Sequence, residues 1–330
     1  MTTILPTEVK VTSHGRLHMG FFDLHGGLGR KFGGIGASLS APSQVITASL
    51  SDRLQVSGES QVRASIIAEQ LLTKLDIKTS VRLEIEQHIP EHAGLGSGTQ
   101  LALAIGSAIS HLYQLNLTTA KIAELTGRGA RSGIGIAAFD HGGLLIDGGR
   151  ISSATTVTKT IAKVPPLLAR YEFPEDWRIL LILDTHQAGI HGDVERQAFD
   201  QLPEFSENLA AHLCRHVLMQ AMPALLERDL TGFGQAIQVL QSHVGDYFSP
   251  AQGGRYASRE VAKILKYLEG RGVACFGQSS WGPTGFAVFN DVLEAENQLQ
   301  QLKATFTDSA LTWLICSGDN HGAEISVTAH

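Results

Sequence analysis

The sequence predicts an α+β protein of two domains, and three observations support this class. The chain has 330 residues, more than one compact core of ordinary size usually holds. Segments with the alternating pattern of strands are mixed with segments at helical spacing in both halves. Pro165, Pro166 and the polar stretch 172–176 interrupt these patterns near the middle. We therefore expect one domain at residues 1–165 and a second at residues 166–330.

The first half contains a strand between two helices. Residues 81–86 alternate apolar and charged side chains, as a half-buried strand does. Residues 62–75 before this strand and residues 101–112 after it carry apolar side chains at helical spacing. Residues 90–98, which connect the strand to the second helix, are rich in glycine. A second glycine-rich passage, residues 127–149, closes this half.

The second half also mixes strands and helices. We expect its strands at residues 178–184, 273–276, 286–289 and 311–316. We expect its helices at residues 206–228, 258–268 and 292–306. Pro223 should bend or divide the first of these helices. Strands separated by helices around a mixed sheet predict an α+β sandwich.

Composition limits the classes of function. The sequence is 43% hydrophobic and 18% charged, as is usual for a folded globular protein. A formal net charge of −6 argues against nucleic acid as a partner. No secretory signal is visible, and no apolar run approaches the ~18 residues that span a membrane, so we expect a cytoplasmic protein without a membrane partner. The cysteines lack metal-ligand spacing and are expected to be reduced thiols: Cys214, Cys275 and Cys316.

The strongest functional motif is the loop at residues 90–99, which reads PEHAGLGSGT. Its glycines allow the backbone to approach a ligand closely. A helix that begins near Ser97 would direct free N–H groups and the positive end of its dipole at an anion. A tight turn with a Ser or Thr N-cap would explain the same residues. We predict that phosphate or diphosphate is bound here by Gly94, Leu95, Gly96, Ser97, Gly98 and Thr99.

This loop resembles the second motif of the GHMP kinases, P-x-x-x-G-L-G-S-S-A, which holds a nucleoside triphosphate in that superfamily. Residues 13–20 (SHGRLHMG) resemble its first motif, which faces the substrate, and residues 277–285 resemble its third. The resemblance covers nearly the whole chain. It implies a GHMP-kinase-like two-domain fold, with an N-terminal domain like domain 2 of ribosomal protein S5 and a ferredoxin-like C-terminal domain.

The chain departs from the kinases at two positions. Gly135 stands where they usually carry an acidic residue near the hydroxyl to be phosphorylated, and a glycine can take no proton. Asp140 lies five residues further on, which is the wrong spacing. Gly98 replaces a serine that helps the kinases with magnesium. Kinase chemistry is therefore disfavoured, although an ATP-dependent small-molecule kinase remains the first alternative. An ATP-using decarboxylase and a ligand sensor without activity follow it.

With the passage at residues 127–149, the motifs resemble one branch of the superfamily, the β-ribofuranosylaminobenzene 5′-phosphate synthases of tetrahydromethanopterin biosynthesis. The resemblance implies that 5-phosphoribosyl 1-diphosphate condenses with 4-aminobenzoate or 4-hydroxybenzoate and releases carbon dioxide and diphosphate. Such an enzyme needs small-molecule substrates and no redox cofactor. We expect Mg²⁺ on the diphosphate, and the family implies a homodimer.

Arg16, His18 and Asp184 are the candidate catalytic residues. On a strand, Arg16 and His18 share one face. Arg16 would clamp a phosphate or carboxylate, and His18 would hydrogen-bond a hydroxyl or buffer a proton. Asp23 and Asp184 are each candidate Mg²⁺ ligands, although Asp184, after an apolar strand, would equally serve as a turn or helix-capping carboxylate.

Further polar residues complete the predicted site. Arg30, Lys31 and Arg131 are further candidate anion partners, and Arg131 is assigned to the phosphate or diphosphate. Substrate contacts are expected from Asp23, Ser132, Gly133, Ser279, Ser280 and Thr284. Turn formation would explain the serines and threonine of the late loop equally well.

Overall fold

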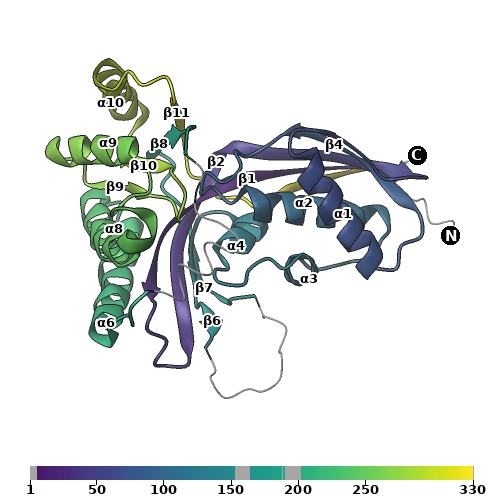
Figure 1. The fold of residues 1–330 in the computed structure, drawn as a ribbon, viewed down its shortest axis with the longest axis horizontal. Coiled ribbons are helices and arrows are strands. Elements are labelled where there is room, and N and C mark those ends of the chain that lie inside the picture. The colour runs from purple at the N-terminus through teal and green to yellow at the C-terminus, as the bar shows by residue number, and fades with distance from the viewer. Residues whose placement is uncertain (1–5, 153–163, 188, 190–201, 330) are drawn as a thin grey trace.

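A computed structural model describes residues 6–152, 164–187, 189 and 202–329. In these residues the chain forms two units, each a sheet covered by helices (Figure 1). The mixed α+β class predicted from the sequence is confirmed. No helix in the described ranges is long and apolar enough to cross a membrane.

The first sheet is built on a long antiparallel hairpin of β1 (Pro6–Asp23) and β2 (Arg30–Ser51). Its other strands are β3 (Gln55–Gly58), β4 (Ser80–Gln87), β5 (Leu144–Asp147), β6 (Arg150–Ile151), β7 (Leu167–Tyr171) and β12 (Glu324–Ala329). β12 pairs with β1 and β7 with β5. Both strands lie beyond residue 165, so this sheet draws on both predicted domains.

Four helices accompany the first sheet: α1 (Gln61–Lys74), α2 (Ser97–Leu112), α3 (Thr119–Leu125) and α4 (Ile134–His141). Buried side chains of α1 and α2 form one hydrophobic cluster with strands β1, β2 and β4. The predicted helix–strand–helix order around β4 is therefore confirmed. The strand-to-helix loop predicted to bind phosphate lies between β4 and α2.

The second sheet has the strand order β11-β8-β10-β9, and all neighbours are antiparallel. These strands are β8 (Arg178–Asp184), β9 (Cys275–Gln278), β10 (Gly285–Phe289) and β11 (Leu311–Cys316). Alternate residues of β8 enter different cores: Leu181 faces α8 (Leu230–Gln252), whereas Leu180 packs with α9 (Arg259–Gly270) and α10 (Val292–Thr305). Burial on both faces explains why this strand is a continuous apolar run.

The predicted helix at residues 206–228 is divided, as Pro223 suggested. α6 (Glu207–His216) leads into a wide π-helical turn, η1 (Val217–Ala221), and then into α7 (Met222–Leu226). Pro223 lies at the start of α7. Because proline has no N–H, it cannot donate the α-helical hydrogen bond to the preceding turn, and the helix is irregular there.

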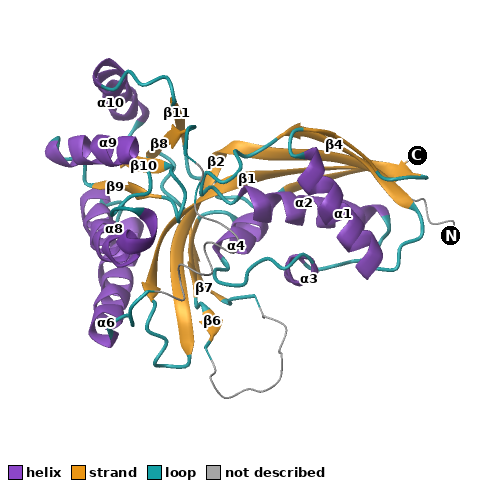
Figure 2. Cartoon of the chain, in the orientation of Figure 1, coloured by secondary structure: helices purple, strands orange, loops and turns teal. Residues whose placement is uncertain are grey.

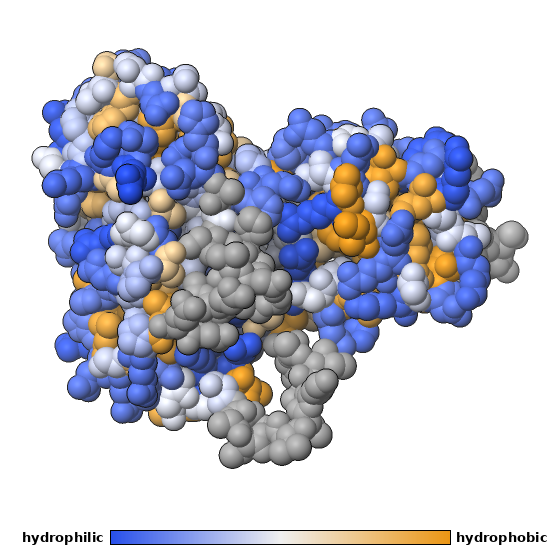
Figure 3. All heavy atoms as spheres, viewed as in Figure 1, coloured by the Kyte–Doolittle hydropathy of each residue, from blue (hydrophilic) through white to orange (hydrophobic). Residues whose placement is uncertain are grey.

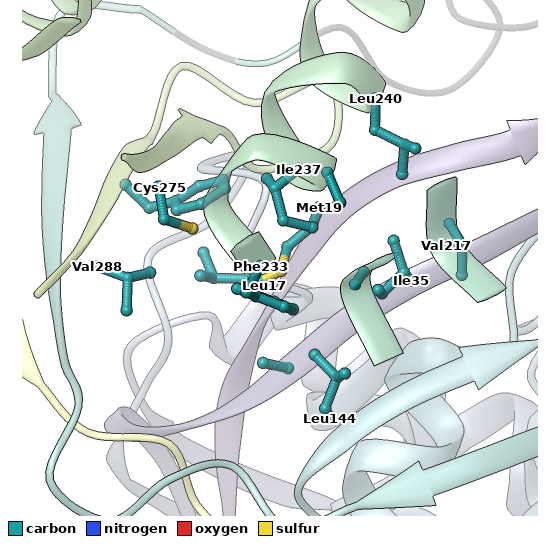
Figure 4. Packing of buried hydrophobic residues seen from close by; sticks show 14 of the residues in the cluster. Leu17, Met19, Ile35, Leu144, Val217, Phe233, Ile237, Leu240, Cys275 and Val288 are labelled. Carbon is teal, nitrogen blue, oxygen red and sulfur yellow. The ribbon is translucent and has the colours of Figure 1, made fainter. Parts of the chain in front are cut away.

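The hairpin β1–β2 passes between the helices of the two units (Figure 2). One hydrophobic core joins Leu17 and Met19 of β1 to Phe233 and Ile237 of α8 (Figure 4). Residues 16–18 of β1 are therefore held rigidly at the junction of both units. All three cysteines are free, and burial raises the pKa of the Cys316 thiol to about 12.

Candidate active site

The phosphate loop ends at Gly96, which has a left-handed φ of 86° and directly precedes α2. The helix begins at Ser97, as predicted. Thr99 N and Gln100 N both donate to Gly96 O at 3.0 Å. The earlier amides belong to the first turn, where an α-helix has N–H groups without intrahelical acceptors. They and the helix dipole make this end of α2 suitable for an anion.

The three predicted motifs come together at Gly94. The hydroxyl of Ser279 donates to Gly94 O at 2.8 Å and accepts from His18 N at 3.1 Å. Ser280 N donates to His18 O at 3.0 Å. Gly282 lies so close that a Cβ there would be 2.4 Å from the Cα of Gly94. Residues far apart in the sequence thus form one site.

Arg16 is a buried cation against the phosphate loop. Its backbone N–H donates to Leu95 O at 3.0 Å, and Nη1 donates to Gly94 O at 2.5 Å. Nε is buried without a hydrogen-bond partner, and within the described residues no carboxylate forms an ion pair with Arg16. Burial lowers the pKa of the guanidinium to about 10, so Arg16 remains charged near neutral pH. A bound anion would supply the missing counter-charge.

His18 is neutral in the folded protein. Burial lowers its pKa to about 3, helped by the positive charge on Arg16. A proton-buffering role for His18 near neutral pH is therefore disfavoured, because a desolvated imidazolium beside an arginine is unfavourable. Its Nε2 is buried and has no partner. A neutral imidazole can instead hydrogen-bond a substrate hydroxyl.

Asp147 was not predicted from the sequence, and it organises the loop before α4. Its carboxylate is fully buried and accepts hydrogen bonds from Ser132 Oγ at 2.8 Å, Gly133 N at 2.9 Å and Gly149 N at 2.8 Å. Burial nevertheless raises its pKa. A Cβ on Gly34 would lie 3.0 Å from His18 Nε2 and 3.2 Å from Asp147 Oδ2, so both groups border the same small space.

A small pocket, about 30 Å³ in volume, opens beside His18, between β1 and α8. Its apolar lining includes Phe21, Phe248 and Trp281, and the last two rings have centroids 4.6 Å apart. Among its polar lining residues, Gln241 is held by hydrogen bonds to backbone groups of both units. The sequence reasoning missed this lining, although Trp281 lies within the third motif. Its aromatic side chains are of the kind that stack against a flat ring.

The remaining predicted residues have more peripheral positions. Asp23 Oδ1 accepts from the backbone of His25 and Gly26 in the β1–β2 turn. Asp184 accepts from Ser258 Oγ at 2.6 Å and from His186 N at 3.0 Å, and the second bond fits the turn alternative. No hydrogen bond or ion pair found in the described ranges joins either aspartate to the phosphate loop.

Among the other predicted anion and substrate contacts, Arg30 donates to the backbone oxygens of Gly148 and Gly149. Arg131 is close enough to Arg150 to lower its pKa further, after the larger effect of burial. Thr284 is fully buried in the third motif, where its carbonyl accepts from Ser279 N. Lys31 is half-buried in β2, where its backbone lies opposite that of Arg150 in the antiparallel strand β6.

The two candidate Mg²⁺ ligands, Asp23 and Asp184, do not lie in one carboxylate cluster within the described residues. Asp23 and Asp184 belong to different turns, and both already accept backbone hydrogen bonds. Across the part of the chain that is described, no three His, Cys, Asp or Glu side chains converge as metal ligands. Each aspartate stays a prediction as a Mg²⁺ ligand, because Mg²⁺ can be bound by one or two carboxylates together with substrate phosphates.

Comparison with known solved structures supports the fold. The chain superimposes on homoserine kinase from Cytophaga hutchinsonii with a TM-score of 0.67 and 16% identity, covering 97% of each chain. It matches mevalonate diphosphate decarboxylase from Staphylococcus aureus with a TM-score of 0.65 and 14% identity, covering 97% of this chain and 98% of the other. The family models for the GHMP kinases N-terminal and C-terminal domains match residues 62–143 and 221–308. The GHMP-kinase-like fold is thus confirmed.

Sequence relatives identify the branch. β-Ribofuranosylphenol 5′-phosphate synthase from Archaeoglobus fulgidus is 34% identical, over 97% of this chain and 100% of the relative. The protein of the same name from Methanocaldococcus jannaschii is 36% identical, over 88% of this chain and 92% of the relative. Together with the shared fold, this similarity along nearly the whole length shows that the chain belongs to the β-ribofuranosylphenol 5′-phosphate synthase family.

Proposed function

We propose that this protein joins C1 of 5-phosphoribosyl 1-diphosphate to the ring of 4-hydroxybenzoate and releases carbon dioxide and diphosphate. The observation that carries the proposal is the meeting of a phosphate loop, the buried cation Arg16 and an aromatic-lined pocket at the neutral His18. The relatives' name specifies a phenol product, which favours the hydroxy acid. 4-Aminobenzoate is the second candidate substrate.

The proposed reaction needs no covalent intermediate with the protein. The bond between C1 and the diphosphate oxygen breaks, and its electron pair leaves with the diphosphate. The para hydroxyl donates electron density into the ring, and the ring carbon that carries the carboxylate attacks C1. The bond to the carboxylate then breaks, carbon dioxide leaves, and its electron pair restores the aromatic ring. The enzyme must stabilise the leaving group and align ring with sugar.

The site residues can be assigned to these tasks. The amides at the start of α2 and the Arg16 guanidinium would bind the diphosphate and stabilise its developing charge. The aromatic side chains beside His18, Phe21 and Phe248, would contact the ring and exclude water from the cationic intermediates. His18 would hydrogen-bond a hydroxyl while remaining neutral, because its pKa lies far below the working pH.

The geometry at Gly135 argues against the kinase alternative. A Cβ at this position would lie 3.2 Å from Thr99 Cγ2, and Gln100 Nε2 already donates to Gly135 O at 2.8 Å. A side chain there would be crowded against Thr99, and the glycine itself supplies no carboxylate at the position where the kinases place one. This packing favours the synthase.

Four further expectations belong to this proposal. Mg²⁺ would arrive as a complex with the sugar diphosphate and be held by its phosphate oxygens. The protein would form a homodimer in the cytoplasm. Its product would enter tetrahydromethanopterin biosynthesis.

Product analysis tests the proposed function. Purified protein is incubated with 5-phosphoribosyl 1-diphosphate and 4-hydroxybenzoate, and in parallel with ATP and candidate alcohols. We expect diphosphate and a phenol C-riboside in equal amounts from the first mixture, by phosphate assay and mass spectrometry. ADP from the second mixture, with no diphosphate from the first, would instead support a kinase.

A further inference from the structure

Two arginines flank the start of α2 at Gly98. A Cβ on Gly98 would lie 2.1 Å from Nη2 of Arg63, which belongs to α1, and 3.3 Å from Nη1 of Arg128, which follows α3. Both guanidinium groups therefore face the glycine in the first turn of the helix. The missing side chain at this position leaves the space that Arg63 occupies.

The two like charges are held close together with little compensation. Burial lowers the pKa of Arg128, and the charge on Arg63 lowers it further. Arg128 Nε is buried without a hydrogen-bond partner. Arg63 has one carboxylate nearby, Glu91, with Nη1 and Oε1 3.6 Å apart. Hydrogen bonding from Ser60 and the charge on Arg63 outweigh burial and lower the pKa of Glu91, so this single negative charge persists.

Arg16 supplies an independent observation at the same loop. It lies on the Gly96 side, where a Cβ would be 3.3 Å from its Cγ, and its buried Nε also lacks a partner. Three guanidinium groups thus surround the first turn of α2, and in the described part of the chain one carboxylate, that of Glu91, forms an ion pair with one of them. Strongly hydrophilic side chains are visible where the α1–α2 side of the first unit meets the second unit (Figure 3). This excess of positive charge, buried at Arg16 and partly buried at Arg63 and Arg128, favours a multiply charged anion.

We infer that Arg63 and Arg128 bind the departing diphosphate, and that guanidinium groups rather than protein-held metal ligands supply the charge it needs. The inference rests on the proposed function for the identity of the anion. Guanidinium groups suit this task because their donors match phosphate oxygens in pairs and stay charged. Donors that are already in place stabilise the leaving group as its charge develops. Mg²⁺ carried by the substrate would then strengthen diphosphate binding, but the protein would bind diphosphate without it.

Calorimetric binding of inorganic diphosphate, in EDTA and in Mg²⁺, tests the inference. We expect the native protein to bind in EDTA with an affinity within a few-fold of that in Mg²⁺. Because each arginine makes charged hydrogen bonds, Arg63→Ala and Arg128→Ala should each weaken binding in EDTA by about 10-fold or more. Arg82→Ala is the matched control, because Arg82 is exposed on β4 and bonds Gln55; it should bind normally. Normal binding by both site variants, or native binding only with Mg²⁺, would overturn the inference.

Gly98→Ser provides a second variant that does not remove an arginine. Its Cβ would take the place of Arg63 Nη2, the mobile end of a long side chain, so Arg63 should move and the fold should survive. We expect weaker binding in EDTA, similar to that of Arg63→Ala, and no further loss when both changes are combined. Additive losses would contradict the inference. Circular dichroism checks that each variant is folded.

Carbon dioxide release by the same proteins separates this inference from the proposed function. If the native protein releases none but diphosphate binding depends on Arg63 and Arg128, the anion site stands and the proposed reaction fails. If release is normal and both alanine variants bind diphosphate as the native protein does, the reaction stands and the arginine assignment fails.

Discussion

Replacing His18 by glutamine should change how the stability of the protein depends on pH. His18 is 3% exposed, and its folded-state pKa is about 3, against an ordinary value of 6.5. Above pH 6.5 the imidazole is neutral in both the folded and the unfolded state. As the pH falls from 6.5 towards 3, only the unfolded chain takes up the proton, so the free energy of unfolding decreases.

The structure sets the size of this effect. Between pH 7 and pH 5 the native protein should lose about 2 kcal/mol more than His18→Gln, because each pH unit inside the window costs about 1.4 kcal/mol. Urea unfolding of both proteins at several pH values measures the difference. His321→Gln, which removes an exposed histidine, is the matched control. Parallel stability curves for the native protein and His18→Gln would refute the assignment of a buried, neutral His18.

Three further changes test the site. Arg16→Ala should lower turnover about 100-fold with the fold intact, because a buried donor to the leaving group is lost; turnover within two-fold of native would remove Arg16 from the site. Gly282→Ala puts a Cβ 2.3 Å from Ala93 O and should lower the free energy of unfolding by about 1–3 kcal/mol, as measured with urea. The same change should weaken diphosphate binding, as measured by calorimetry. Gly270→Ala, with open space at its Cβ, is its control, and equal stability of the two would contradict the packing. Asp147→Asn directs an amide nitrogen at N–H and O–H donors and should also cost about 1–3 kcal/mol in urea unfolding; an unchanged unfolding midpoint would argue against it.

Local patterns made much of the fold predictable. The phosphate loop could be recognised because its chemistry depends on glycines and on a helix start that are neighbours in the sequence. The hairpin β1–β2 was not among the predicted elements. Residues 33–39 of β2 are buried throughout and glycine-rich, so they show no alternation of apolar and polar side chains.

Helix α8 was not predicted either, because two of its residues are unfavourable in helices. Gly234 lowers its helical propensity, and Pro250 lies inside its last turns. The structure shows why the glycine is present: a Cβ there would be 2.5 Å from the backbone of Ala274, so α8 can approach the strand β9 closely. Tertiary packing, which the local sequence does not display, determines this residue.

The site was only partly predictable. Arg16, His18 and Ser279 could be found because they lie in recognisable motifs. Arg63 and Arg128 could not, because nothing in the neighbouring sequence indicates that α1 and the segment after α3 direct guanidinium groups at Gly98. Such residues become visible only when contacts distant in the sequence are known.

Release of labelled carbon dioxide tests the central claim most directly. The purified protein is supplied with carboxyl-labelled 4-hydroxybenzoate or 4-aminobenzoate and Mg²⁺, with and without 5-phosphoribosyl 1-diphosphate. We predict release that depends on the sugar diphosphate, is faster with the hydroxy acid, and is nearly lost in Arg16→Ala. No release from either acid by folded protein that binds diphosphate would contradict the proposed reaction.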